Sequence, residues 1–110
     1  MKEQIKVLDR EHLVQIIKDS PVNADLNHLD VSSVTDMSWM FDGSQFTGDI
    51  SQWNVSSVVN MCGMFYNSQF NGDISKWNVG SVIIMDDMFY NSQFNGDMPN
   101  WNVSSTVLVK

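Results

Sequence analysis

One 24-residue unit repeats along most of the chain, and this period constrains the fold more than any other feature. The copies are residues 25–48, 49–72 and 73–96, followed by a half copy over residues 97–105. Trp53, Trp77 and Trp101 occupy the same place in successive copies. Self-similarity at a period of about 20 to 50 residues is typical of stacked repeat arrays. We therefore expect Trp53 and Trp77 to be buried and to contact one another.

The spacing of apolar residues within each unit predicts a strand, a short helix and a turn. The W-x-V step alternates with a period of two, which favours strands at residues 52–55, 76–79 and 100–103. The apolar spacing then changes to three and four, as in Val58, Met61, Met64 and Phe65, which favours a helix. Residues that tolerate the left-handed region, Gly43, Asn67 and Asn91, would end these helices. An inward phenylalanine would anchor each turn: Phe46, Phe70 and Phe94.

The first twenty residues differ from the repeats and predict a separate cap. Asp9 is a good N-cap for a helix over residues 10–18, and Ser20-Pro21 would end that helix. We expect a capping unit at residues 1–20 and an array of about three and a half repeats at residues 21–110. The predicted fold class is an α/β repeat solenoid, a short right-handed array similar to leucine-rich repeats.

The repeat unit resembles that of a known family. The pattern I-x-x-W-x-V is similar to the L-x-x-L-x-L core of leucine-rich repeats, and GDISxWNVSSVxxMxxMFxNSxF resembles the repeat of the BspA-like bacterial surface proteins, also found in mycoplasma lipoproteins. The similarity covers residues 22–105, and this chain resembles a short, unsecreted member. The resemblance implies a leucine-rich-repeat fold and a role in binding other proteins.

Charge is concentrated in the repeats. Residues 25–109 contain nine aspartates and one cation, Lys76, while the whole chain carries a net charge of −7. This acidity argues against direct binding to nucleic acid or an anionic membrane and suits a basic partner protein. Cys62 is the only cysteine, so no internal disulfide is possible. The opening residues lack the features of a secretion signal, and we expect a cytoplasmic protein.

An aspartate recurs at the start of every unit and has two interpretations. Stacked carboxylates could bind calcium, with Asp49, Asp73 and Asp97 as weak metal candidates. Alternatively, each aspartate accepts hydrogen bonds from the backbone of its own turn, and we favour this structural interpretation. No cofactor is predicted.

Positions that vary between copies are free to specialise, because invariant positions are needed for stacking. The candidate partner-binding residues are Trp39, Asp42, Tyr66, Ile83, Asp86, Asp87 and Tyr90. Exposed aromatics beside acids suit a protein interface, although the two tyrosines could equally pack against adjacent turns. No arrangement of residues typical of an enzyme is found.

The function predicted first is therefore a non-enzymatic protein-interaction module. The alternatives are a phage or mobile-element inhibitor that occupies a basic nucleic-acid-binding site on a host protein, and a calcium-binding structural repeat.

The end of the chain has no evident cap. Its apolar residues, Trp101, Val103, Val107 and Val109, are candidates for self-association, which predicts a homodimer through residues 98–110. Alternatively, residues 107–109 fold back and cover the last repeat within one chain.

Overall fold

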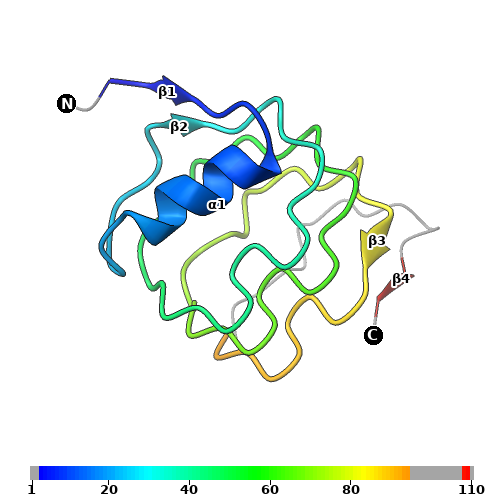
Figure 1. The fold of residues 1–110 in the computed structure, drawn as a ribbon. Helices are drawn as coiled ribbons and strands as arrows, with labels where there is room; N and C mark the ends of the chain where they lie inside the picture. The colour runs from blue at the N-terminus through cyan, green and yellow to red at the C-terminus, as the bar shows by residue number, and fades with distance from the viewer. Residues whose placement is uncertain (1–2, 95–107, 110) are drawn as a thin grey trace.

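The described residues form one helix and four very short strands, joined by long loops that lie side by side (Figure 1). The computed structural model describes residues 3–94 and 108–109. The elements in chain order are β1 (Ile5–Lys6), α1 (Arg10–Lys18), β2 (Leu29–Asp30), β3 (Ile84–Met85) and β4 (Leu108–Val109). β1 pairs in parallel with β2, and β3 pairs in parallel with β4. Both pairings join residues 24 positions apart, as in Ile5 with Leu29 and Ile84 with Leu108.

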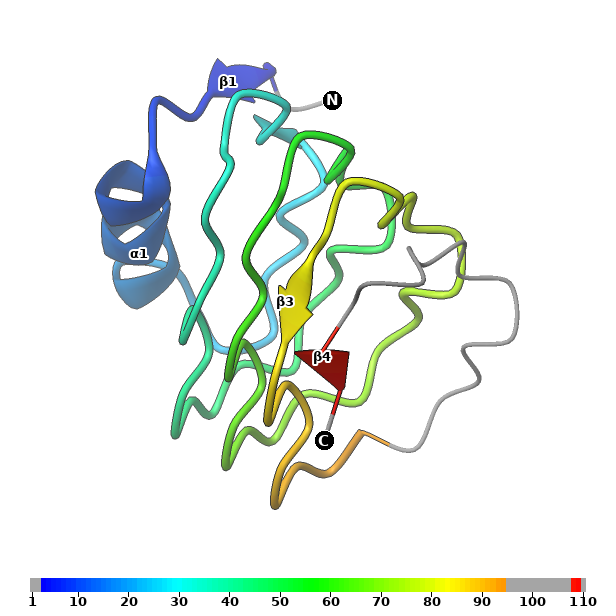
Figure 2. The same cartoon turned by 90° about the vertical axis from the view of Figure 1, so that its right-hand side faces the viewer.

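Helix α1 begins and ends where the sequence predicts. The Asp9 side chain accepts a hydrogen bond of 2.9 Å from the His12 backbone N–H, which satisfies one donor of the first turn. Leu13 is fully buried, and Val14, Ile16 and Ile17 pack against the core from the same helix. Figure 2 shows α1 across one end of the body, beside the loop that follows β2. The helix therefore shields one end of the core from water.

The predicted α/β repeat solenoid, with a strand, helix and turn in every 24 residues, is wrong. In the described part of the chain α1 is the one helix, and no strand forms at residues 52–55 or 76–79. The third predicted strand, at residues 100–103, lies outside the described residues. The chain is a small compact globule: its radius of gyration is 12.8 Å, close to the roughly 13 Å expected of a single domain of this length.

Backbone hydrogen bonding explains why the predicted helices do not form. An α-helix directs every N–H to the carbonyl four residues back. Here alternate N–H groups bond instead to the neighbouring loop, 23 residues later in the chain, over 2.8–2.9 Å: Met61, Gly63, Phe65 and Asn67. Of the N–H groups between them, those of Met64 and Tyr66 bond to the carbonyls three residues back, and that of Cys62 bonds to the Asn60 side chain. The spacing of three and four between the apolar residues therefore comes from successive turns and not from a helix.

Left-handed backbone at two positions of each unit also interrupts any helix. The first set is Trp39, Gly63 and Asp87, with φ values of 57°, 60° and 56°. The second set is Gly43, Asn67 and Asn91, with φ values of 64°, 53° and 54°. The left-handed conformation of the second set agrees with the sequence pattern, but these residues close turns. A right-handed helix cannot pass through such residues, and here they recur four positions apart.

Aromatic rings from successive loops stack in the core. Trp53 and Trp77 are each 3% exposed, and their rings lie 6.3 Å apart and nearly parallel. This confirms the prediction for these two tryptophans. Their indole N–H groups donate to the carbonyls of Leu26 and Ile50. Phe46 and Phe70 are buried, and Phe94 is partly buried, so the turns are anchored as predicted.

Candidate protein-interaction surface

Three exposed or half-buried aromatic side chains from successive loops form a connected aromatic cluster, defined as Trp39, Tyr66 and Tyr90. Trp39 and Tyr66 meet edge to face with ring centroids 5.4 Å apart. Tyr66 and Tyr90 stack with centroids 5.2 Å apart. Trp39 is 41% exposed and Tyr90 is 59% exposed. The structure therefore brings together the three aromatic residues among the predicted partner-binding candidates.

Backbone hydrogen bonds between successive loops hold equivalent residues in two adjacent columns. Each loop contributes one residue to each column. Trp39, Gly63 and Asp87 form the first column, and Asp42, Tyr66 and Tyr90 form the second. Within each loop the second residue donates its N–H to the carbonyl of the first, over 3.0–3.2 Å. The rings therefore cross from Trp39 in the first column to Tyr66 and Tyr90 in the second. Asp42 lies in the same turn as Trp39, and Asp87 lies in the same turn as Tyr90.

Gly63 permits the Trp39 ring to lie where it does. A Cβ atom at Gly63 would collide with three atoms of the Trp39 indole, so the ring rests directly on the glycine backbone. Gly63 itself is buried, and its φ of 60° suits a residue without a side chain. The repeat pattern did not predict this contact between Trp39 and Gly63.

The two carboxylates beside the cluster, Asp42 and Asp87, have no ion pair within the described residues. The single ion pair found there joins Arg10 to Glu11 on α1. Beside the tyrosines, the Asn91 side chain donates a 2.6 Å hydrogen bond to the Asn67 side chain. This hydrogen bond between side-chain amides ties together the two loops that carry Tyr66 and Tyr90.

The remaining partner candidates lie outside the aromatic cluster. Ile83 is 46% exposed and its N–H donates to the Val59 carbonyl, so the two apolar residues form a separate exposed pair. Asp86 is half-buried, and its Oδ1 atom has no hydrogen-bond partner in the described structure. Burial raises the pKa of the Cys62 thiol, and the carboxylates of Asp86 and Asp87 raise it further. Cys62 is therefore protonated at neutral pH and a poor nucleophile.

The candidate metal residues hold hydrogen bonds within their own turns. Asp49 and Asp73 each accept from the backbone N–H two residues later, at 2.9 Å, and from the serine hydroxyl of that residue. For Asp49, the Ser51 N–H, the Asn27 side chain and the Ser51 hydroxyl lower the pKa. For Asp73, the Ser75 N–H and hydroxyl lower the pKa more than repulsion from Asp49 raises it. These hydrogen bonds are those of the structural interpretation, in which each aspartate accepts from the backbone of its own turn. Asp97 lies outside the described residues.

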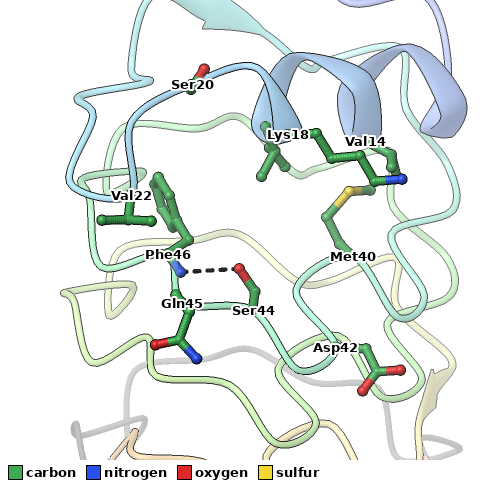
Figure 3. A pocket seen from close by; sticks show the side chains of 10 residues that line it. Val14, Lys18, Ser20, Val22, Met40, Asp42, Ser44, Gln45 and Phe46 are labelled. Atoms are coloured by element: carbon green, nitrogen blue, oxygen red, sulfur yellow. Dashed lines mark hydrogen bonds between the residues drawn. The ribbon is translucent and has the colours of Figure 1, made fainter.

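A cavity of about 310 Å³ lies between α1 and the loop at residues 40–46 (Figure 3). Val14 and Lys18 line it from the helix, while Met40, Asp42 and Phe46 line it from the loop. Asp42 thus borders both the cavity and the aromatic cluster. The sequence pattern does not predict this cavity, because its existence depends on how α1 lies over the loop.

Most of the C-terminal candidates for self-association lie outside the part of the chain that the structure describes. Trp101, Val103 and Val107 lie outside the described residues, while Val109 belongs to β4 and pairs with Met85 of β3. Within residues 3–94 and 108–109, no cluster of three or more His, Cys, Asp or Glu residues is arranged to hold a metal ion. The same part of the chain contains no helix long and apolar enough to cross a membrane.

The model of the family described as "Mycoplasma protein of unknown function, DUF285" matches residues 11–110. No curated protein and no solved structure matches the chain.

Proposed function

The chain belongs to the DUF285 family, a mycoplasma family of unknown function, and we propose that it is a non-enzymatic module that binds a partner protein. The binding surface in this proposal is the aromatic cluster with Asp42 and Asp87. The similarity of the repeat to those of BspA-like surface proteins supports the same class of function.

The observation that carries the proposal is the contact between exposed rings from successive loops. Large aromatic side chains left partly in water are typical of protein interfaces, where they contribute much of the binding free energy. The cluster is held by backbone hydrogen bonds, by the close approach of Trp39 to Gly63 and by the side-chain hydrogen bond between Asn67 and Asn91. A surface ordered before binding loses less conformational entropy when a partner docks.

A displayed library of random peptides, selected on the wild-type protein, tests the proposal. Each selected peptide is then measured on the double variant Trp39→Ser/Tyr90→Ser and on Leu8→Ser. Leu8 is 67% exposed and precedes α1, so its variant removes an exposed apolar side chain outside the cluster.

We expect the selected peptides to lose about tenfold or more in affinity for the double variant, because truncating an interface aromatic commonly costs more than about 1 kcal/mol. Binding to Leu8→Ser should not change. Selected peptides that bind the double variant as tightly as wild type, or a selection that yields no binder, would contradict the proposal. Circular dichroism checks that each variant is folded.

A further inference from the structure

We propose that the aromatic cluster recognises arginine side chains on a basic segment of the partner protein. This inference rests on the proposed function and adds the chemistry of the partner. It follows from the way in which rings and carboxylates share turns on this surface.

The two columns place both kinds of group that a guanidinium ion prefers in one small area. Three rings form the cluster, and Asp42 and Asp87 lie in the same turns as the two end rings, Trp39 and Tyr90. A guanidinium group is planar, permanently charged and weakly hydrated, so it stacks on an aromatic ring while its N–H groups bond to a carboxylate. The surface therefore matches arginine by both stacking and charge.

The charge of the chain favours a cationic partner. Residues 25–109 contain nine aspartates against Lys76 alone, so the cations that neutralise this region must come largely from outside it. Neither Asp42 nor Asp87 is engaged by a cation among the described residues. Lys18 lines the cavity that Asp42 also borders, but no ion pair joins the two residues.

Two other partner chemistries use only part of the surface. A lysine ammonium is a compact, strongly hydrated point charge, so it would pair with the carboxylates and gain less from the rings. A proline-rich segment would pack against the rings and leave Asp42 and Asp87 unused. Arginine is the side chain that engages both features.

Synthetic peptides with three arginines in a glycine-serine background test the inference on the folded wild-type chain. Matched peptides carry three lysines, three citrullines or a proline-rich core, and titration calorimetry at about 150 mM salt limits unspecific attraction between distant charges. Citrulline keeps the planar shape of arginine and removes its charge. We expect the arginine peptide to bind about tenfold or more tightly than each of the others, because it alone gains both stacking and charge pairing.

Variants assign the preference to the cluster. Trp39→Ser/Tyr90→Ser should bring the arginine and lysine peptides to equal affinity, while Asp42→Asn/Asp87→Asn should weaken both. Asp73→Asn is the matched control, because it removes a carboxylate outside the cluster and keeps the Oδ1 acceptor of its own turn. This control should change the affinity for the arginine peptide by less than about twofold, since distant exposed charges are screened.

The possible results separate the inference from the proposed function. Equal affinity of wild type for arginine and lysine peptides would overturn the inference and indicate unspecific charge attraction. Library-selected peptides that lack arginine yet depend on Trp39 and Tyr90 would also overturn it, while supporting the proposed function. A complete absence of binders that depend on the cluster would overturn both.

Discussion

Short polar side chains close the corners of this chain by bonding to the backbone two residues further on. The Oδ1 atoms of Asp30, Asp49, Asn54, Asn60, Asp73 and Asn78 accept in this way, and so do the hydroxyls of Ser44, Ser68 and Ser92. Such turns compete with helix formation for the same donors. These aspartate, asparagine and serine side chains therefore close turns within the repeats.

The charged members of this set predict a dependence of stability on pH. Hydrogen bonds from Ser32, Ser51 and Ser75 lower the pKa values of Asp30, Asp49 and Asp73 below their ordinary value of 3.8. A carboxylate with a lowered pKa stabilises the folded state fully above the unfolded value, and this contribution is lost as the pH falls through the folded pKa.

We therefore expect the triple variant Asp30→Asn/Asp49→Asn/Asp73→Asn to melt below wild type at about pH 6, with the difference shrinking below about pH 3.8. Thermal unfolding followed by circular dichroism across this range measures the difference. The control Asp42→Asn/Asp87→Asn removes two carboxylates that close no turn in the described structure. A difference that stays constant with pH would contradict the assignment.

The stacked tryptophans give a second prediction for single residues. Trp77→Ala removes a ring that is 3% exposed, its stacking on Trp53 and its hydrogen bond to Ile50. We expect a loss of about 3–5 kcal/mol in the free energy of unfolding, as for other large-to-small core substitutions.

Trp39→Ala is the matched control for Trp77→Ala, because the same side chain is 41% exposed at position 39. Its expected loss is below about 1 kcal/mol, since surface substitutions have small effects. Urea denaturation compares the two variants, and similar losses in both would be inconsistent with the burial described above.

The element that replaces the predicted helices is a series of turns bonded to their neighbours. The loops at residues 37–43 and 61–67 direct alternate N–H groups to the next loop and use the others in their own turns, so these donors are not available for a helical pattern. Left-handed residues at two positions in each loop make this possible. The packing of the loops and their backbone conformation are therefore coupled.

Two left-handed glycines allow this coupling to be measured. Gly43→Ala and Gly63→Ala both place a Cβ atom at positive φ, but the new atom meets nothing at Gly43 and collides with the Trp39 ring at Gly63. We expect Gly43→Ala to lose about 1–2 kcal/mol from backbone strain alone. Gly63→Ala should lose more, and urea denaturation gives both values. Equal losses would show that the Trp39 contact contributes nothing.

At the scale of the whole molecule the two ends differ. α1 lies over the core at the first end, with Leu13 buried beneath it. At the other end β4 pairs with β3 within the chain, and the order of this sheet leaves the second edge of β4 unpaired among the described strands. An unpaired edge is a common site for association with another chain.

The prediction of a homodimer through residues 98–110 can therefore be tested directly. We expect light scattering at tens of micromolar to give twice the mass of one chain, because a two-fold contact would cover both unpaired edges. Val107→Asp should restore the monomer. Val22→Asp is the control, since Val22 is 55% exposed near the opposite end of the chain. A wild-type monomer would rule out the dimer.

The sequence by itself determined the features that depend on local chemistry and on the 24-residue period. Asp9 and the apolar residues of α1 predicted that helix, and the recurring tryptophans predicted the buried stack of Trp53 on Trp77. The left-handed conformation of Gly43, Asn67 and Asn91 was likewise predictable, because these residue types tolerate it. Each of these features requires only neighbouring residues or an equivalent residue one period away.

Only the tertiary structure decided whether the apolar spacing of three and four becomes a helix or a series of turns. That outcome depends on whether a carbonyl of the adjacent loop is within reach of each N–H, which no single repeat reveals. The position of Trp39 over Gly63, its edge contact with Tyr66 and the cavity beside Asp42 are decided in the same way. Each results from packing between loops, where sterics and shared hydrogen bonds override the preference of the local sequence.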